Sequence, residues 1–494
     1  MMGTRGGGAV IAIDQGTTNT KAILVDAAGA VIAKASAPLK SSYPKPGWAE
    51  QSADDIWVSV QSVIADVAKG REHEVSGLAI ANQRETLVVW DAGTGNPIAP
   101  AILWQCRRTA KACERLIAEG KDPQVIEATG LSINALFPAS KLAWVMENVT
   151  EATTLASQGR LRAGTVDSWL LYKLTGGSVF ATDHSNASRT QLFNTGKLEW
   201  DEDLCRLFGA PSSVLAEVRP SDSRFGELNK DATALPAGVP ILAMMGDSHA
   251  ALYGHGVRAP GLVKATYGTG SSLMTLTPER VVSKNGLSST IAWSNTDGVS
   301  YALEGNITVS AQAAAFAAEM LGLPDARALS DLAMSVPDSG GVIFVPALAG
   351  LGAPRWNDNV TGTISGMTLA TSRAHIARAT LEAIVLQITD VFSAMEKDIG
   401  GTLQGLLADG GASSNDTLMQ LQADILDRPV TRSGQAEVGA IGVAAMARHS
   451  LDGSVSPLDA SRVDFTPNKD RATEAWRDGV NRDWRALLAR LIAN

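Results

Sequence analysis

The N-terminal segment of residues 9–26 limits the fold of this chain more than any other feature. Residues 9–13 form a short run of small and branched apolar side chains, which is typical of a buried strand. The run ends at the carboxylate of Asp14, turns at Gly16, and continues into a second apolar run over residues 22–25. This pattern predicts either an ordinary hairpin or a hairpin whose backbone N–H groups and hydroxyls bind a phosphate.

Two further turns of small residues follow predicted strands later in the chain. A strand over residues 262–266 leads into Tyr-Gly-Thr-Gly at residues 267–270, and the apolar residues 406–408 lead into Asp-Gly-Gly-Ala at residues 409–412. Glycine lets the backbone approach a phosphate or a flat ring closely because it has no Cβ atom. Three such turns favour phosphate binding over three ordinary connections, although the chain contains no GxxxxGK[ST] loop and no protein-kinase motif set.

The length and composition describe a globular protein of more than one domain. A chain of 494 residues is too long for one core, and its 45% hydrophobic and 19% charged residues are ordinary for a folded protein. The net charge of −9 argues against nucleic-acid binding. The three cysteines lack the spacing of a zinc site or a disulfide framework, and no apolar stretch is long enough to span a bilayer. We therefore expect a cytoplasmic protein with no membrane and no nucleic-acid partner.

Strand-like and helix-like segments alternate along most of the chain, which predicts an α/β fold. Helices are expected at residues 54–68 and 471–493, and another is expected to begin after Thr371 or Ser372, where apolar residues recur every three or four positions. Glycine and proline cluster at residues 254–261, so we expect a domain boundary there. Besides the strands already named, strands are expected at residues 21–26, 31–36, 75–81 and 87–91.

A second group of candidate residues follows the predicted strand at residues 75–81. Arg84 offers a planar set of donors and Glu85 a pair of acceptors, which suits the adjacent hydroxyls of a polyol. The alternative is a solvated ion pair on a loop. Trp104 could form an apolar wall of such a pocket, or it could be an ordinary core residue.

A third candidate site follows the fully apolar run of residues 239–245. Asp247 comes directly after this run and Gly246, and a carboxylate there is costly unless it has a partner or a task. It could accept the proton of a hydroxyl that attacks a phosphoryl group. His249 is the alternative base, but its offset of two residues is expected to direct it elsewhere.

These segments together resemble the FGGY family of carbohydrate kinases, and within it the glycerol kinase branch, from about residue 10 to about residue 446. The resemblance implies two actin-like (ribonuclease H-like) ATPase domains facing each other across a cleft, and a homodimer or homotetramer. It implies an N-terminal domain at residues 9–256, a C-terminal nucleotide-binding domain at residues 262–449, and a helical extension at residues 450–494. The similarity is carried by residues 14–18, 46–50, 82–86, 164–170, 185–190, 267–270, 303–305, 350–354 and 409–412.

The resemblance also implies roles for individual residues. Asp247 is expected to be the catalytic base, and Asp14 and Asp247 are expected to lie beside Mg²⁺. Contacts with ATP are expected from Thr17, Thr18, Asn19, Lys21, Thr269, Ala311, Ala315, Gly411 and Asn415. Contacts with the polyol are expected from Arg84, Glu85, Trp104, Leu136, Asp247, Ser248 and Ser272.

The chain departs from glycerol kinases at three polyol positions. Leu136 replaces a Tyr, Ser272 replaces a Phe and Ser248 replaces a Gln, so the pocket is expected to be roomier and to suit a polyol of four or five carbons. Ala311 and Ala315 stand where Gly and Gln are common, so contacts with the base are expected to differ. The loop that binds fructose 1,6-bisphosphate in some bacterial glycerol kinases is not evident at residues 228–234, and we do not expect that regulation.

The predicted function is ATP-dependent phosphorylation of a primary hydroxyl of a small polyol. A ketopentose kinase of the xylulose or ribulose type is the enzymatic alternative. A non-catalytic, actin-like ATP-binding scaffold is an alternative of a different class, and the candidate residues Asp14, Asp247, Arg84 and Glu85 argue against it.

Overall fold

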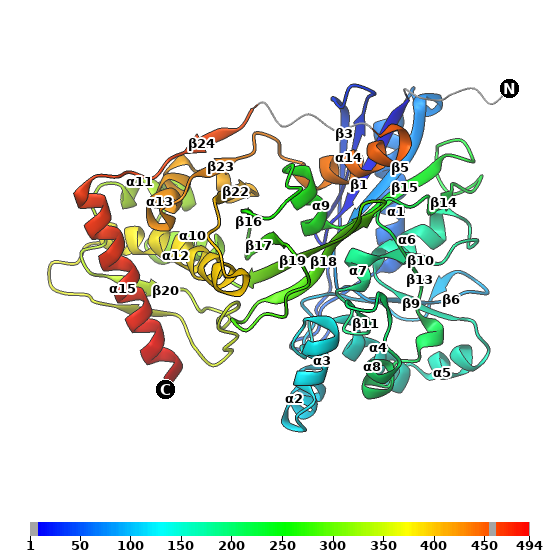
Figure 1. The fold of residues 1–494 in the computed structure, drawn as a ribbon, viewed down its shortest axis with the longest axis horizontal. Helices are drawn as coiled ribbons and strands as arrows, with labels where there is room; N and C mark the ends of the chain where they lie inside the picture. Colours follow the sequence, from blue (N-terminus) through cyan, green and yellow to red (C-terminus); the bar gives the residue numbers. More distant parts are fainter. Residues whose placement is uncertain (1–7, 454–460, 494) are drawn as a thin grey trace. The chain divides into compact units, whose positions relative to one another are not determined.

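The computed structural model describes residues 8–453 and 461–493, and the chain divides into two compact units (Figure 1). The first unit contains the chain up to Gly256 together with Ser289–Ala302 and the segment that starts at Glu437. The second contains Val257–Ser288, Leu303–Ala436 and the described residues from 461 onward. These units are discontinuous in sequence, so they differ from the expected linear boundaries of residues 9–256, 262–449 and 450–494.

The first unit is built on a six-stranded sheet with the order β14-β15-β5-β1-β2-β3. β1 and β2 form the predicted antiparallel hairpin, in which Asp14 pairs with Lys21 and Gln15 with Thr20. β5 and β15 run parallel to β1 and to each other, so their carboxyl ends lie at one edge of the sheet. The strands of the sheet are β1 (Ala9–Gln15), β2 (Asn19–Val25), β3 (Val31–Pro38), β5 (Val75–Asn82), β14 (Gly226–Glu227) and β15 (Pro240–Gly246).

Shorter strands and most of the helices complete the first unit. The shorter strands are β4 (Glu50–Gln51), β6 (Val88–Asp91), β7 (Asn96–Pro97), β8 (Ala101–Ile102), β9 (Leu161–Gly164), β10 (Ala181–Asp183), β11 (Phe193–Asn194), β12 (Glu199–Trp200) and β13 (Glu217–Arg219). The helices are α1 (Ala53–Ala68), α2 (Ala110–Ala118), α3 (Asp122–Thr129), α4 (Pro138–Asn148), α5 (Thr150–Ser157), α6 (Val166–Leu174), α7 (His184–Ala187), α8 (Glu202–Phe208), α9 (Asp247–Gly254) and α14 (Val438–Asp452).

Helix α14 joins the first unit from late in the sequence. In Figure 1 this orange helix lies beside the blue strand β1, and it contacts α9, β1, β5 and β15. The contact with α9 is very close, because a Cβ atom on Gly442 would lie 1.8 Å from the carbonyl oxygen of Ala250. The small residues of the sequence Val-Gly-Ala-Ile-Gly at residues 438–442 therefore let α14 pack directly against the helix that begins at Asp247.

The main sheet of the second unit has the strand order β19-β17-β16-β22-β23-β24. β16 and β17 form a second antiparallel hairpin, and β22 runs parallel to β16. Its strands are β16 (Leu262–Tyr267), β17 (Ser271–Thr277), β22 (Gly405–Asp409), β23 (Val430–Arg432), β24 (Val463–Phe465) and the end of β19 (Gly298–Ile307), with β20 (Ile343–Val345) and β21 (Thr363–Ser365) as a separate pair. Strand β18 (Ser288–Asn295) and the start of β19 fall mainly in the first unit.

The helices of the second unit are α10 (Gln312–Met320), α11 (Ala326–Ala333), α12 (Arg373–Ile399), α13 (Asp416–Leu426) and α15 (Arg471–Ala493). The predicted long helix is α12, and Ser372 caps it as expected, in a capping box with His375. Its apolar stripe lies in the core of the unit, where Trp484 of α15 is also buried. The predicted alternation of strands and helices is confirmed in both units.

Within the residues that the structure describes, no helix has both the length and the apolar composition that crossing a membrane requires.

Candidate active site

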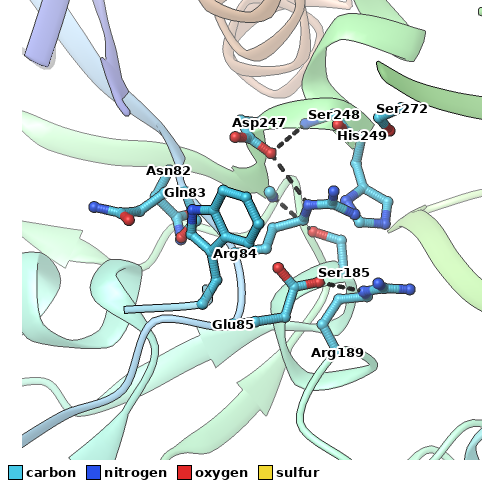
Figure 2. A network of polar contacts seen from close by, with 12 residues as sticks. Asn82, Gln83, Arg84, Glu85, Ser185, Arg189, Asp247, Ser248, His249 and Ser272 are labelled. Atoms are coloured by element: carbon cyan, nitrogen blue, oxygen red, sulfur yellow. Dashed lines mark hydrogen bonds and ion pairs between the residues drawn. The ribbon is translucent and has the colours of Figure 1, made fainter. Parts of the chain in front are cut away.

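Asp247 lies where β15 ends and α9 begins, at the carboxyl edge of the first unit's sheet. Its Oδ1 atom accepts hydrogen bonds from Arg84 Nε at 3.1 Å and from the backbone N–H of Ser248 at 2.6 Å (Figure 2). The Arg84 side chain is buried, whereas the Asp247 side chain is 40% exposed. Charge-assisted hydrogen bonds thus fix the carboxylate without covering it.

His249, the alternative base, is in a different environment. Its side chain is fully buried, and its Nε2 atom lies 3.1 Å from the hydroxyl of Thr290. An accessible basic group is therefore provided by Asp247 and not by His249, in agreement with the expected effect of the two-residue offset.

The segment of residues 82–86 is buried, so the interpretation of Arg84 and Glu85 as a solvated ion pair is wrong. Arg84 is 8% exposed and Glu85 is 5% exposed. Glu85 Oε1 accepts a hydrogen bond from Arg189 Nε at 2.7 Å, while Arg84 is paired with Asp247 (Figure 2). Buried charged groups are rare unless they are paired or functional, and both of these are paired.

Lys141 of α4 holds the backbone at Glu85 by a hydrogen bond. Its ammonium group is fully buried and donates hydrogen bonds of 2.7 Å to the backbone carbonyl oxygens of Glu85 and Leu136. Glu85 has a φ of 59°, a conformation that non-glycine residues adopt only when their surroundings hold it. Loss of hydration lowers the pKa of Lys141 to about 7. The Lys141 ammonium group therefore links the backbones of Glu85 and Leu136, two residues expected to contact the polyol.

A buried polar network holds the strand end that precedes Asp247. The hydroxyl of Ser185 accepts a hydrogen bond from the Gly246 N–H at 3.0 Å and donates one to Asp183 Oδ1 at 3.0 Å. Asn186 donates to the same carboxylate oxygen at 2.8 Å and exchanges hydrogen bonds with Asn82. All four side chains are buried and satisfied by one another, which gives the carboxyl ends of β5 and β15 a rigid support.

The first hairpin places Asp14 near Asp247 and opposite Lys21. Lys21 Nζ forms an ion pair of 3.1 Å with Glu437, the residue that precedes α14. Loss of hydration, followed by the charge of Asp247, raises the pKa of Asp14 to about 7; Glu437 also raises it and Lys21 lowers it. A Cβ atom on Gly439 would lie 3.4 Å from Asp14 Oδ2 and 3.6 Å from the Asp247 carbonyl, so the first turn of α14 borders both residues.

The tip of this hairpin presents unused donors. The backbone N–H groups of Thr17 and Thr18 donate no hydrogen bond within the described part of the chain, while the Gly16 N–H closes the turn on the Asn19 carbonyl at 3.0 Å. The Asn19 side chain donates to the Thr18 hydroxyl at 3.3 Å. Trp104 is 40% exposed, and its indole N–H donates to the hydroxyl of Thr17 at 3.0 Å. Trp104 is thus hydrogen-bonded to the turn of the first hairpin.

Six of the expected site residues lie in the second unit. Thr269 is exposed at the tip of the second hairpin, and its carbonyl accepts the Ser310 N–H at 2.8 Å, directly before Ala311. Ala315 is exposed on α10, and Gly411 is exposed after β22. Asn415 caps α13 through a hydrogen bond of 3.1 Å from the Leu418 N–H. Ser272 donates to Glu304 Oε1 at 3.0 Å.

Several residues that shape the site were not selected from the sequence. Lys141 stands in an otherwise apolar part of α4, which is a usable signal. Arg189 lies in a segment that carries the family resemblance but was given no role. Glu437 has no local signal, because 416 positions separate it from its partner Lys21.

Comparison with known families identifies both parts of the chain. The FGGY family of carbohydrate kinases, N-terminal domain, matches residues 9–254, and the C-terminal domain of the same family matches residues 263–451. The chain therefore belongs to the FGGY family of carbohydrate kinases. It is an ATP-dependent kinase, as predicted, and its predicted two-domain α/β fold is confirmed.

Individual relatives match over nearly the whole chain. A glycerol kinase of Symbiobacterium thermophilum is 45% identical over 490 residues, covering 96% of this chain and 98% of that protein. An apulose kinase of Pectobacterium atrosepticum is 44% identical over 491 residues, covering 97% and 98%. The crystal structure of Plasmodium falciparum glycerol kinase with ADP is 30% identical, has a TM-score of 0.92 and covers 98% of each chain.

Proposed function

We propose that this kinase transfers the terminal phosphoryl group of ATP to a primary hydroxyl of a small polyol, either glycerol or a polyol of four to five carbons. The observation that supports this most directly is the Asp247 carboxylate, which is fixed by Arg84 and Ser248 and yet 40% exposed. A fixed and accessible carboxylate can orient a hydroxyl and accept its proton as phosphoryl transfer proceeds.

The other roles in this proposal follow from the donors and charges of the site. Thr17 and Thr18 would bind the terminal phosphates through their backbone N–H groups, which have no acceptor within the described residues. Lys21 would add positive charge beside the transferred group, and Arg84 and Glu85 would hold the remaining hydroxyls of the acceptor. Thr269, Ala311, Ala315, Gly411 and Asn415 remain the proposed nucleotide contacts of the second unit.

The chemistry of Asp14 fits a divalent cation. Burial and the charge of Asp247 raise its pKa to about 7 in spite of Lys21, so a cation beside Asp14 would stabilise its ionised form. Among the described residues no three His, Cys, Asp or Glu side chains converge on one point. A cation between Asp14 and Asp247 would therefore complete its coordination with water and phosphate oxygens, as Mg²⁺ does. We propose Mg²⁺, which would neutralise charge on the transferred phosphoryl group.

The size of the acceptor follows from three residues of the expected polyol site. Leu136, Ser248 and Ser272 support a polyol larger than glycerol, because each is smaller than the residue expected in a glycerol kinase. The second candidate is a ketopentose kinase, which the apulose kinase relative favours because it is nearly as similar as the glycerol kinase.

A panel of acceptors tests these alternatives. ADP release would be measured with glycerol, tetritols, pentitols and ketopentoses, and we expect the highest kcat/KM with a four- or five-carbon polyol. A clear preference for glycerol would contradict the larger pocket, and a clear preference for a ketopentose would favour the second candidate. Turnover with no member of the panel would contradict the proposal as a whole.

The role of Asp247 has its own test. Asp247→Asn keeps the shape of the side chain but removes its basicity, so kcat should fall by about 10²- to 10⁴-fold. Binding of the polyol, measured by calorimetry, should remain detectable. A variant with nearly normal kcat would show that another group is the base.

A further inference from the structure

The segment of residues 82–86 contains a glutamine that the proposed mechanism does not use. Gln83 is 2% exposed, and its side-chain amide makes four hydrogen bonds. Its Oε1 atom accepts from the hydroxyls of Thr17, at 3.1 Å, and Thr86, at 2.9 Å. Its Nε2 atom donates to Oε1 of Gln15 and Oε1 of Gln51, both at 3.2 Å. The amide thus uses every donor and acceptor that it has.

Trp104 closes these contacts into a ring. Its indole N–H donates to the Thr17 hydroxyl at 3.0 Å, and its backbone N–H donates to the Thr86 hydroxyl at 3.2 Å. Both hydroxyls in turn donate hydrogen bonds to the same oxygen of Gln83, Oε1. Trp104 is therefore connected to Gln83 by two separate paths, one through its side chain and one through its backbone.

The ring fixes what the Thr17 hydroxyl can do. A hydroxyl has one proton, and here that proton is directed to Gln83 while Trp104 uses one acceptor position. The Thr17 side chain in this arrangement orients its turn instead of donating to a phosphate. Gln51 adds to the restraint, because its Nε2 atom donates to the Thr17 carbonyl at 2.5 Å. These hydrogen bonds restrain the turn and thereby the direction of its backbone N–H groups.

We propose that Gln83 is a positioning residue that couples the acceptor side of the site to the phosphate-binding turn, by holding Trp104 and Thr17 in one hydrogen-bonded ring. The inference rests on the proposed function for the assignment of Trp104 to the acceptor and of the turn to ATP. It predicts an effect across the two subsites: removing the indole N–H of Trp104, on the acceptor side, weakens the binding of nucleotide.

The test is a double-mutant cycle with Gln83→Met and Trp104→Phe in the full chain, read out as the dissociation constant of ADP by calorimetry. Gln83→Met keeps the length of the side chain without its amide, and Trp104→Phe keeps an aromatic ring without the N–H. Each single variant should weaken ADP binding by about five-fold, the typical cost of one or two lost hydrogen bonds. Because both act through the Thr17 hydroxyl, the double variant should weaken it by about five- to ten-fold and not by the product, about 25-fold.

Two controls separate positioning from loss of stability. Trp200→Phe removes a comparable indole hydrogen bond, from Nε1 to the Ala216 carbonyl at 2.8 Å, and should leave ADP binding unchanged. Thr86→Val breaks only the backbone path, so it should weaken ADP binding less than Gln83→Met does; it also provides a reading if Gln83→Met does not fold. Unchanged or tighter ADP binding in Trp104→Phe, or strictly multiplicative effects in the cycle, would overturn the inference.

The readout needs no acceptor, so the inference and the proposed function can fail separately. If no polyol or ketopentose is phosphorylated while the cycle is non-multiplicative, the proposed function fails and the ring retains its effect on the turn. If a polyol is phosphorylated and the cycle is multiplicative, the function stands and the coupling role of Gln83 is wrong.

Discussion

The two hairpins, one in each unit, share a plan but carry different chemistry. In both, a buried strand leads into a turn with backbone N–H groups that donate to no acceptor among the described residues, at Thr17 and Thr18 in one and at Thr269 in the other. In the next-to-last pair of each ladder the first hairpin has Asp14 opposite Lys21, whereas the second has Thr266 opposite Ser272. At the turn end the first hairpin thus combines neutral donors with charge, whereas the second offers neutral donors alone.

This difference indicates a division of labour between the hairpins. Charge is useful next to the phosphoryl group that moves, because its charge distribution changes during the reaction. Neutral backbone donors suffice for groups that are only held. We therefore expect substitutions at corresponding positions of the two hairpins to have very unequal effects on turnover.

The largest difference in kcat is expected between substitutions of Asp14 and of Thr266, which lie near the ends of β1 and β16. Asp14→Asn should lower kcat by about 10²- to 10³-fold, because it removes the charge proposed to hold the cation beside the reacting phosphate. Thr266→Val, at the corresponding position, should change kcat by less than about three-fold, because the Thr266 side chain carries no charge. Steady-state kinetics with ATP and the best acceptor measures both. Equal effects of the two substitutions would remove the proposed distinction.

The next largest difference is expected between Lys21 and Ser272, the ladder partners of Asp14 and Thr266. Lys21→Met should lower kcat/KM for ATP by about 10- to 100-fold, the value of a charge-assisted hydrogen bond to phosphate. Ser272→Ala should leave kcat/KM for ATP within about three-fold and act on the acceptor instead. A large effect of Ser272→Ala on ATP would show that the second hairpin also takes part in the phosphate chemistry.

The glycines of the two turns should show the opposite order, with the larger effect in the second hairpin and on stability instead of turnover. A Cβ atom on Gly270 would lie 2.4 Å from the carbonyl of Ile307, whereas one on Gly16 would lie 3.1 Å from the carbonyl of Asn19. Gly270→Ala should therefore lower the free energy of unfolding by about 1–3 kcal/mol, and Gly16→Ala by less. Urea unfolding of each variant measures this, and a larger loss for Gly16→Ala would contradict the packing argument.

The smallest effect concerns the pH dependence that the charged hairpin should impose. In the free enzyme Asp14 has a pKa of about 7, so kcat/KM for ATP should fall as the pH drops through this value and the carboxylate takes up a proton. Glu437→Gln removes a negative charge that raises this pKa and leaves Lys21, which lowers it, so the acidic limb of the kcat/KM profile should move to lower pH. Glu119→Gln makes the same change of charge on an exposed side chain of the first unit and should not move the limb. A shift to higher pH in Glu437→Gln would contradict the assigned charges.

Sequence patterns predicted the local features of the site well. The strand that contains Asp14 near its end, the strand that precedes Asp247 and the capped start of α12 all follow from residue periodicity and turn chemistry over short stretches. Arg84 and Glu85 were recognised by residue type, but their burial was not, because burial depends on what packs over a loop. Pairs such as Lys21 with Glu437 and Glu85 with Arg189 join distant positions, so no local pattern records them. The roles of the site residues stay predictions until the variants are measured.

The late position of α14 in the sequence bears on how the protein is made. Strands β1, β5 and β15 and helix α9 are synthesised long before residues 438–452, so the face that α14 covers stays exposed while residues 255–437 are made. During that interval Lys21 also lacks its partner Glu437. A nascent chain or a fragment that ends at Gly256 is therefore expected to need a chaperone or to aggregate, and the charge balance around Asp14 is set only in the final part of synthesis.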